Sequence, residues 1–255
     1  PITNSKKPDL RYIDRSFNLL SKILKRGDII VLESTVYPGV TRSFTKKLEK
    51  KTKLLNNHDF STCYSPERIN PGDKDRNLNN INKILAYEGR DKKVKKLLFS
   101  VYKKISKKLI FSKNIKEAET AKGIENIQRD LNIALFNEIL MICNKLKLNF
   151  NEVVRLASTK WNFINFSPGL VGGHCLPVDP YYFSYIANKK KYKANVILAG
   201  RKINNYMETY IIKKIIKLTK INSKNIKILL FGATYKPNVA DIRSSLPLSI
   251  FKFLK

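Results

Sequence analysis

The chain has 255 residues, 43% of them hydrophobic, and a formal net charge of +30, which fits one large globular domain or two smaller ones. No apolar run approaches the roughly 20 residues that cross a bilayer, and residues 1–7 lack the apolar core of a signal peptide, so we expect a cytoplasmic protein without membrane contact. The 50 basic residues are 39 Lys and 11 Arg spread over most predicted helices, whereas base-reading sites favour clustered Arg, so nucleic acid is not the expected partner.

Three apolar runs in the first half of the chain predict buried strands. They lie at residues 28–33, 84–89 and 108–112, and a basic helix that starts near Asp91 separates the last two. Strands that alternate with helices are typical of a parallel sheet in an α/β fold.

The pattern changes to long helices from about Ile115. Apolar residues at 127, 131, 134, 135 and 139 recur at helical spacing, and this helix is expected to extend to about Leu148. A shorter helix is predicted over residues 152–157 and a second long one over about 193–218. Residues 225–232 predict a strand that opens a new α/β domain, which the remaining length cannot complete.

Cysteine and histidine are few. The three cysteines, Cys63, Cys143 and Cys175, form an odd set that argues against a disulfide framework and for a reducing compartment. The two histidines are His58 and His174, and no Cys or His pair has the spacing of a zinc site. We therefore expect no metal.

Residues 168–180 place Cys175 in a loop bounded by glycine and proline, with Asp179 four residues later. Glycine lets a backbone approach a ligand closely, and proline stiffens the loop. A lone cysteine is usually a small buried hydrophobe, but this loop favours a nucleophile that faces a substrate.

Five ordered segments carry a family resemblance. They are residues 33–41, 65–72, 119–126 continuing to 137–138, 168–180 and 231–243. Their order and spacing resemble the UDP-glucose/GDP-mannose dehydrogenase family over essentially the whole chain. Residues 160–163, followed by the Cys175 loop and Tyr181-Tyr182, most resemble the branch that acts on UDP-N-acetylglucosamine or UDP-N-acetylgalactosamine.

The resemblance implies an α/β protein of three parts. Residues 1–113 would be the C-terminal part of a Rossmann-like NAD-binding domain. Residues 114–218 would form a central all-helical domain that carries the Cys loop, a long connecting helix and a homodimer interface. Residues 219–255 would begin a second Rossmann-like domain, which binds the UDP-sugar.

The implied reaction is a four-electron oxidation that reduces two NAD⁺ and converts the C6 alcohol of a UDP-N-acetylhexosamine to a uronic acid for a surface polysaccharide. Cys175 would attack the aldehyde to give a thiohemiacetal and then a thioester, which water cleaves. The alternatives are a UDP-N-acetylmannosamine or UDP-glucose 6-dehydrogenase, a non-catalytic dimerisation module, and a basic nucleic-acid binder. Val178 stands where the UDP-glucose branch has a lysine, which argues against that substrate.

Four further residues receive catalytic interpretations. Lys122 could favour the thiolate and stabilise an oxyanion at C6, and Asn126 lies one helical turn away on the same face. Asp179 could orient water or Lys122, act as a base, or simply form a turn before Pro180. Glu67 follows Ser65-Pro66 at the end of a predicted strand, and it is the candidate that activates the hydrolytic water.

The resemblance also implies a set of binding residues. Ser34, Thr35 and Val36 would lie by the cofactor and the catalytic water, with Arg243 reaching towards the cofactor and Thr35 also serving catalysis. The substrate pocket would be lined by Glu67, Arg68, Ile69, Lys122, Asn126, Phe166, Ser167, Pro168, Gly169, Gly172, Gly173 and Lys236. No role is assigned to His174, because other branches carry Ser or Tyr at that position.

The chain departs from the family pattern at its start. It contains no Gly-x-Gly-x-x-Gly motif, and the first strand, the phosphate loop and the acidic ribose-binding residue would all precede Pro1. We therefore expect a fragment that binds NAD and UDP poorly and is inactive by itself.

Overall fold

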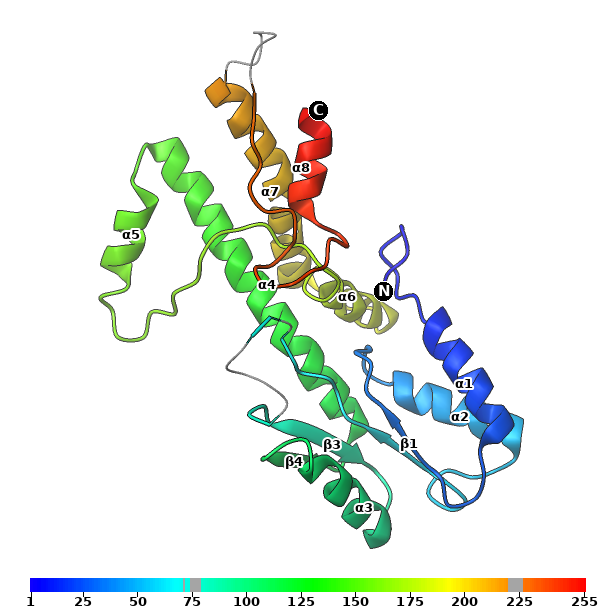
Figure 1. Cartoon of the computed structure of the whole chain (residues 1–255). Helices are drawn as coiled ribbons and strands as arrows, with labels where there is room; N and C mark the ends of the chain where they lie inside the picture. Colours follow the sequence, from blue (N-terminus) through cyan, green and yellow to red (C-terminus); the bar gives the residue numbers. More distant parts are fainter. Residues whose placement is uncertain (71, 74–78, 220–226) are drawn as a thin grey trace. The chain divides into compact units, whose positions relative to one another are not determined.

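The structure is a computed structural model that describes residues 1–70, 72–73, 79–219 and 227–255 (Figure 1). The chain divides into two compact units. Unit 1 comprises Pro1–Glu125 and Tyr181–Lys190, and unit 2 comprises Asn126–Pro180 and Lys191–Lys255. Unit 1 contains a β-sheet with helices, whereas unit 2 is built mainly from helices.

The sheet of unit 1 has four strands in the order β1-β2-β3-β4. They are β1 (Ile29–Leu32), β2 (Ser61–Tyr64), β3 (Lys83–Tyr87) and β4 (Leu109–Ser112). The strands predicted at residues 28–33, 84–89 and 108–112 correspond to β1, β3 and β4, and the strand predicted to end before Glu67 corresponds to β2. The α/β class is confirmed.

Strand direction follows the connections. The pairs β1–β2 and β3–β4 are parallel, and each is joined by a helix, α2 (Val40–Thr52) or α3 (Lys92–Lys103). The β2–β3 pair is antiparallel, and no helix is found between these strands among the residues described. A crossover helix is the usual way to return a strand in parallel, so the expected parallel sheet is mixed at this pair.

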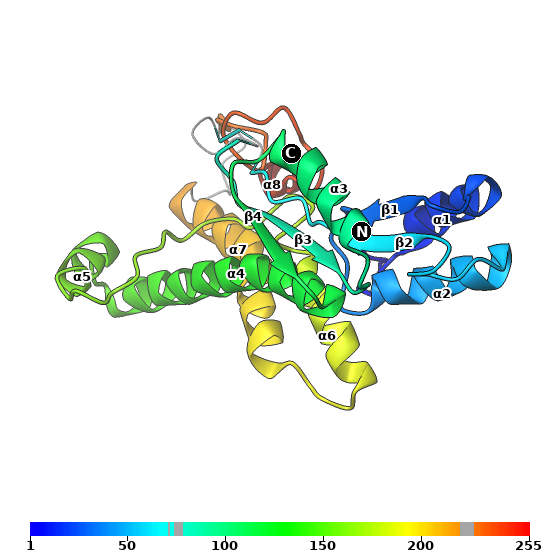
Figure 2. The same cartoon turned by 90° about the horizontal axis from the view of Figure 1, so that it is seen from below.

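Both faces of the sheet are covered, as Figure 2 shows for α2 and α3. Helices α1 (Arg11–Ile23) and α2 pack on one face, where the rings of Phe17 and Phe44 stack with centroids 4.7 Å apart. On the other face α3 buries Val94 and Leu98 against Leu85 of β3. Asp91 caps α3 by accepting from the backbone N–H of Lys93, which confirms the predicted helix start.

The long helices lie close to their predicted positions. They are α4 (Ile115–Leu146), α5 (Phe150–Ala157) and α7 (Asn195–Thr219). Two shorter helices, α6 (Asp179–Lys189) and α8 (Leu246–Leu254), were not predicted. Among the helices of the described residues, none is both long and apolar enough to cross a membrane.

The strand predicted over residues 225–232 is wrong for its described part. Residues 225–226 lie outside the described residues, and residues 227–232 are irregular. Leu229 and Phe231 are 77% and 88% exposed. A strand needs a neighbour for its backbone hydrogen bonds, and none of the four strands pairs with this segment.

Candidate active site

Helix α4 turns polar residues inward. Its buried polar residues are Glu119, Lys122, Asn126, Asp130 and Asn137, each at most 9% exposed. Their spacing of three, four, four and seven residues keeps them on one helical face. An interior-facing stripe is normally apolar, and buried polar groups need partners, so each of these side chains calls for a specific contact.

Glu119 holds the turn that follows β1. Its carboxylate accepts hydrogen bonds from the backbone N–H of Thr41 at 2.8 Å, from the Thr41 hydroxyl at 2.6 Å and from the N–H of Gly39 at 2.5 Å. These N–H groups belong to the start of α2, where a negative charge is favourable. Burial raises the pKa of Glu119, although the three hydrogen bonds oppose the shift.

The turn held by Glu119 carries the residues predicted to lie by the cofactor. Val36 is 1% exposed and belongs to the core, so it anchors the segment. Ser34 is exposed and Thr35 half-buried, directly after β1. Both hydroxyls are therefore at the carboxyl edge of a parallel strand pair, where α/β proteins bind ligands.

Glu67 follows β2 and is partly exposed. One carboxylate oxygen accepts from the N–H groups of Arg68 and Ile69, each at 2.7 Å, and the other lies 3.2 Å from the Lys83 ammonium. Burial pushes the pKa of Glu67 upward, but the Ile69 N–H and the Lys83 charge outweigh it, so the pKa lies below its ordinary value. Glu67 is therefore ionised at neutral pH.

Glu125 joins two of the predicted site residues. Its carboxylate lies 2.7 Å from the Arg68 guanidinium and 3.9 Å from the Lys122 ammonium. Arg68 also donates to the carbonyl of Asn82 at 2.8 Å. Unit 1 thus brings the segment after β2 to the turn of α4 that carries Lys122.

In unit 2 the Cys175 loop leads straight into α6. Cys175 is exposed as a thiol, and its carbonyl accepts from the N–H groups of Val178 and Asp179, each at 3.0 Å. Asp179 is the first residue of α6, and Pro180 occupies the first turn, where its missing N–H costs nothing. Asn126 donates to Asp179 at 2.6 Å, so unit 2 brings these two predicted residues together one turn beyond Cys175.

The glycines of this loop lie against the motif at 231–243 and the residues that follow it. The N–H of Gly173 donates to the carbonyl of Ser244 at 3.3 Å. A Cβ on Gly172 would lie 2.8 Å from that same oxygen, and one on Gly173 would lie 2.9 Å from the Tyr235 ring. Gly173 also has a φ of +85°, which side chains rarely adopt.

The charged residues near the loop pair with one another. Arg243 makes an ion pair of 2.6 Å with Asp241, and His174 lies 3.8 Å from the same carboxylate. Burial raises the pKa of Tyr235, and the charges on Asp241 and Cys175 add to the shift. Lys236 is half-buried, and its carbonyl accepts from the Thr234 hydroxyl at 2.8 Å.

The substrate-pocket residues ahead of the glycines are placed by α4. The Phe166 ring packs near Phe136, with centroids 6.3 Å apart. Ser167 is exposed and Pro168 half-buried. Gly169 exchanges two hydrogen bonds with the Asn137 side chain.

Two family models match the chain. The NAD-binding domain of the UDP-glucose/GDP-mannose dehydrogenase family matches residues 1–106, and the central domain of that family matches residues 116–206. Together they match most of the sequence. The chain belongs to the UDP-glucose/GDP-mannose dehydrogenase family. The central-domain match includes the whole polar face of α4 and the Cys175 loop of this family member.

Named relatives agree with the family. The chain is 42% identical to a UDP-N-acetyl-D-glucosamine 6-dehydrogenase of Pseudomonas aeruginosa and 43% identical to one of Salmonella typhi, over its whole length in both cases. It spans 61% and 60% of these proteins. Among solved structures, the UDP-D-ManNAc dehydrogenase of Pyrococcus horikoshii matches with a TM-score of 0.87 and 30% identity, over 100% of this chain and 60% of the other.

The sequence motifs of this family member did not identify the residues that hold the functional side chains in place. The functional candidates were found as motif positions, but their supports Glu119, Glu125 and Asn137 were not given roles. A signal was present, because the polar residues of α4 recur with the same period as a buried face. Apolar periodicity alone does not reveal this polar face.

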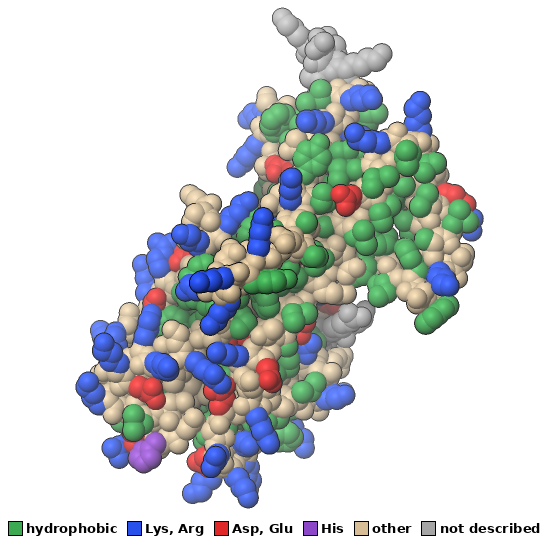
Figure 3. Space-filling view, turned by 180° about the vertical axis from the view of Figure 1, so that it is seen from behind, with side chains coloured by type: hydrophobic (Ala, Val, Ile, Leu, Met, Phe, Trp, Pro, Cys, Tyr) green, Lys and Arg blue, Asp and Glu red, His purple; other side chains and the backbone are tan. Residues whose placement is uncertain are grey.

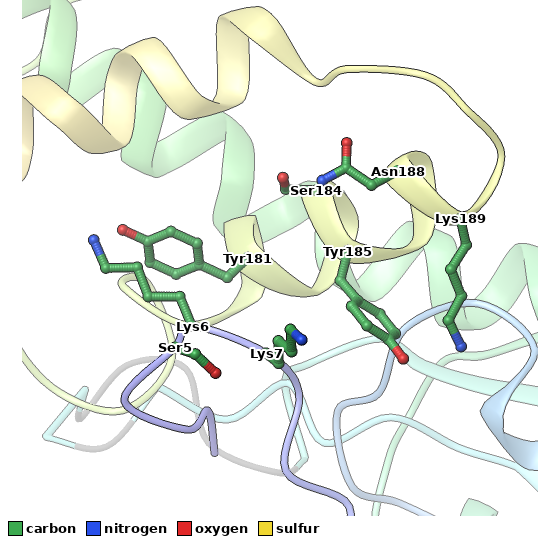
Figure 4. A pocket seen from close by; sticks show the side chains of 8 residues that line it. All are labelled: Ser5, Lys6, Lys7, Tyr181, Ser184, Tyr185, Asn188 and Lys189. Carbon is green, nitrogen blue, oxygen red and sulfur yellow. The ribbon is translucent and has the colours of Figure 1, made fainter.

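None of the predicted site residues lines a hollow in unit 1 (Figure 4). It is lined by Ser5, Lys6, Lys7, Tyr181, Ser184, Tyr185, Asn188 and Lys189. Lys6 and Lys189 lie over the faces of Tyr181 and Tyr185, at 5.1 and 4.6 Å from the ring centroids. In a chain with 50 basic residues, three lysines around a surface hollow follow from composition.

Proposed function

We propose that the whole protein to which this chain belongs is an NAD-dependent nucleotide-sugar 6-dehydrogenase, which oxidises the C6 alcohol of a UDP-N-acetylhexosamine to a carboxylate. The observation that carries the proposal is the Asn126–Asp179 hydrogen bond of 2.6 Å, which lies one turn beyond the exposed Cys175 thiol. A polar pair beside an exposed nucleophile is the arrangement expected of covalent catalysis. The sugar acid would then enter a surface polysaccharide.

The residues at the end of β1 fit the nicotinamide end of the cofactor. Ser34 and Thr35 present hydroxyls at the carboxyl edge, and Glu119 holds their turn without occupying it. NAD⁺ held at this edge would supply the hydride acceptor that both oxidations need.

Cys175 supplies the covalent chemistry in this mechanism. Loss of a hydride from C6 and a proton from its hydroxyl gives an aldehyde, to which the Cys175 sulfur adds to form a thiohemiacetal. Loss of the second hydride from C6, together with the proton of the thiohemiacetal hydroxyl, gives a thioester. Water then attacks the thioester carbon, the C–S bond breaks, and the products are the carboxylate and the thiol.

The remaining residues stabilise charge and handle water. Lys122 is 9% exposed, so its ammonium can stabilise an oxyanion at C6 more strongly than a solvated lysine would. Asn126, oriented by Asp179, can donate to the same oxyanion. Glu67 is held ionised beside Lys83, and can accept the proton of the water that cleaves the thioester.

The choice of sugar rests on the relatives. Two relatives named UDP-N-acetyl-D-glucosamine 6-dehydrogenase are 42% and 43% identical to the chain, whereas the UDP-N-acetyl-D-mannosamine dehydrogenase of Methanocaldococcus jannaschii is 35% identical. This difference favours UDP-N-acetylglucosamine. UDP-N-acetylmannosamine is the second candidate, because similar solved structures carry that name.

The outer face of α4 supports a homodimer. Leu135, Ile142 and Leu146 are 51%, 50% and 61% exposed on this helix. Figure 3 shows hydrophobic side chains gathered on one part of the surface, while Lys and Arg side chains are spread over much of the rest of that face. An apolar patch of this kind usually marks a protein interface.

The test is NADH formation by the whole protein with four sugars in parallel: UDP-N-acetylglucosamine, UDP-N-acetylgalactosamine, UDP-N-acetylmannosamine and UDP-glucose. The expected result is two NADH for each UDP-N-acetylglucosamine consumed. Cys175→Ser should abolish carboxylate formation, whereas Cys143→Ser, at a buried cysteine outside the site, should not. No NADH with any of the four would leave the dimerisation module as the better interpretation.

A further inference from the structure

Asn137 of α4 pairs with the backbone of Gly169 as a neighbouring strand would. Its side-chain NH₂ donates to the Gly169 carbonyl at 3.0 Å, and its side-chain oxygen accepts from the Gly169 N–H at 2.8 Å. Residues 158–178 form neither helix nor strand, so their backbone groups must find partners elsewhere. One amide side chain thus satisfies both polar groups of one peptide residue.

A buried chain of hydrogen bonds, here called the relay, fixes the orientation of this amide; its members are Asn137, Asn204, Asp130 and Arg201. Asn137 also donates to the side-chain oxygen of Asn204 at 2.8 Å. Asn204 in turn donates to Asp130, at 2.9 Å to its carbonyl and 2.8 Å to its carboxylate. Arg201 lies 2.5 Å from the same carboxylate.

Only one arrangement of these amides satisfies every bond. Asp130 offers only acceptors, so the NH₂ of Asn204 must face it, and the oxygen of Asn204 then faces Asn137. That oxygen requires the NH₂ of Asn137, which leaves the Asn137 oxygen for the Gly169 N–H. Asn137, Asn204 and Asp130 are 0% exposed and Arg201 is 3% exposed, so water does not compete for these bonds.

Burying the polar and charged side chains of the relay costs free energy, because these groups lose their contacts with water. Burial raises the pKa of Asp130, and the Arg201 charge only opposes that shift. Apolar side chains of similar volume can often replace a buried ionic network without loss of stability. Apolar side chains could not hold the Gly169 backbone in place, because they offer it no hydrogen bonds.

A second anchor lies four residues further on. The Gly173 N–H donates to the Ser244 carbonyl at 3.3 Å, and Val171 between the anchors is 5% exposed. The stretch 169–173 is therefore fixed at both ends and in its middle. Cys175 follows two residues after the second anchor.

We propose that Asn137 is a positioning residue for substrate, which fixes the Gly169 backbone so that residues 169–173 face the sugar in one conformation; this rests on the proposed function. Asn137 does not touch the reacting atoms. Its effect reaches them through the loop that leads to Cys175. The amide is required because an aspartate at 137 would set an oxygen against the Gly169 carbonyl and the Asn204 oxygen.

The first experiment measures the anchor in this chain directly. Hydrogen exchange of the Gly169 amide should accelerate about tenfold in Asn137→Ala, because its acceptor is lost. Asn132→Ala is the matched control, since Asn132 lies on the same helix and donates to the carbonyl of Gln128. Unchanged exchange at Gly169 in Asn137→Ala would overturn the inference.

The second experiment separates positioning from stability in the whole protein. Asn137→Ala and Asn137→Asp should both raise the KM for the UDP-sugar about tenfold while the KM for NAD stays within about twofold. Asn132→Ala should change neither value. A lower melting temperature with an unchanged sugar KM would mean a merely structural role and would overturn the inference. Absence of NADH formation by the unmodified protein would instead overturn the proposed function, and the exchange measurement would still decide the anchor.

Discussion

The side-chain amide of Asn126 donates a hydrogen bond of 2.6 Å to a carboxylate oxygen of Asp179, and both residues are buried. The bond joins the middle of α4 to the first residue of α6 within unit 2. It also fixes the orientation of the Asn126 side chain, whose NH₂ group must face the carboxylate. The catalytic proposal therefore depends on a contact between two segments that lie 53 residues apart in sequence.

Asn126→Ala should lower the free energy of unfolding by about 2 kcal/mol, because the buried Asp179 carboxylate loses a charge-assisted donor. Urea unfolding of the chain measures this directly. Asn132→Ala, on the same helix, should stay within about 0.5 kcal/mol of the unmodified chain. Equal losses in the two variants would mean that the Asn126–Asp179 bond contributes little.

Replacement by alanine should affect the stability of the chain differently at two glycines of the Cys175 loop. At Gly172 a Cβ would lie 2.8 Å from the Ser244 carbonyl, so Gly172→Ala should cost about 1–3 kcal/mol. At Gly169 a Cβ would meet nothing within 4 Å, so Gly169→Ala should stay within about 0.5 kcal/mol. Thermal unfolding of the two variants compares them, and similar midpoints would contradict the packing described at Ser244.

Cys175 should be the cysteine that iodoacetamide labels in the folded chain. It is exposed, whereas Cys63 and Cys143 are buried. Burial also raises the pKa of the Cys63 thiol to about 12, which suppresses its thiolate at neutral pH. Mass spectrometry after brief labelling should find one modified site, and Cys175→Ser should remove it; early modification of Cys63 or Cys143 would be the contrary result.

The contribution of Glu67 to stability should depend on pH in a defined direction. Its pKa in the folded chain lies below the ordinary 4.5, because the Ile69 N–H and the Lys83 charge outweigh burial. A lowered acid pKa stabilises the fold above the unfolded-state pKa, and this stabilisation is lost as the pH falls through the folded-state value.

Glu67→Gln should therefore melt below the unmodified chain at neutral pH, and the difference should shrink below about pH 4.5. Melting temperatures of both chains across an acidic pH series provide the measurement. Glu138→Gln, at an exposed position of α4, serves as the control and should show a smaller gap at neutral pH. A gap that widens on acidification would reverse the assigned sign.

A charge on the outer face of α4 should prevent self-association. Leu135→Glu places a carboxylate in the exposed apolar patch and should convert a dimer of the whole protein to monomers in analytical ultracentrifugation. Lys145→Glu makes a charge change on the same helix and should leave the dimer intact. If the Leu135 variant sediments as the unmodified protein does, the dimer uses another surface.

The sequence predicted those elements that have a strong local signal. The apolar runs of β1, β3 and β4 predicted the bounds of those strands, whereas β2 was predicted only as a strand that ends before Glu67, because it begins with the polar residues Ser61 and Thr62. These polar residues are buried only because helices cover both faces of the sheet, which is a tertiary effect. Helix α6 was missed because Asp179-Pro180 resembles a turn, although proline is well suited to a first helical turn.

The sequence predicted the reactive side chains of the candidate site, but it did not predict the buried residues that hold them in place. Cys175 and Glu67 were recognisable from their motifs. The role of Asn137 depends on where Gly169 lies, and the role of Asp130 depends on Arg201, which is 71 residues away. Contacts of this kind are set by the packing of helices, and one sequence does not contain that information.

Helix α4 buries its polar face and exposes apolar side chains, and this arrangement limits which substitutions its sequence can accept during evolution. A residue of α4 such as Asp130 or Asn137 cannot change alone, since each substitution leaves a buried partner without its hydrogen bond, and effects within such a network are not additive. The exposed apolar positions are constrained only by a partner that packs against them. Over long times the buried charged and amide positions of this helix should vary least, whereas an ordinary surface helix carries its polar positions on the face that varies.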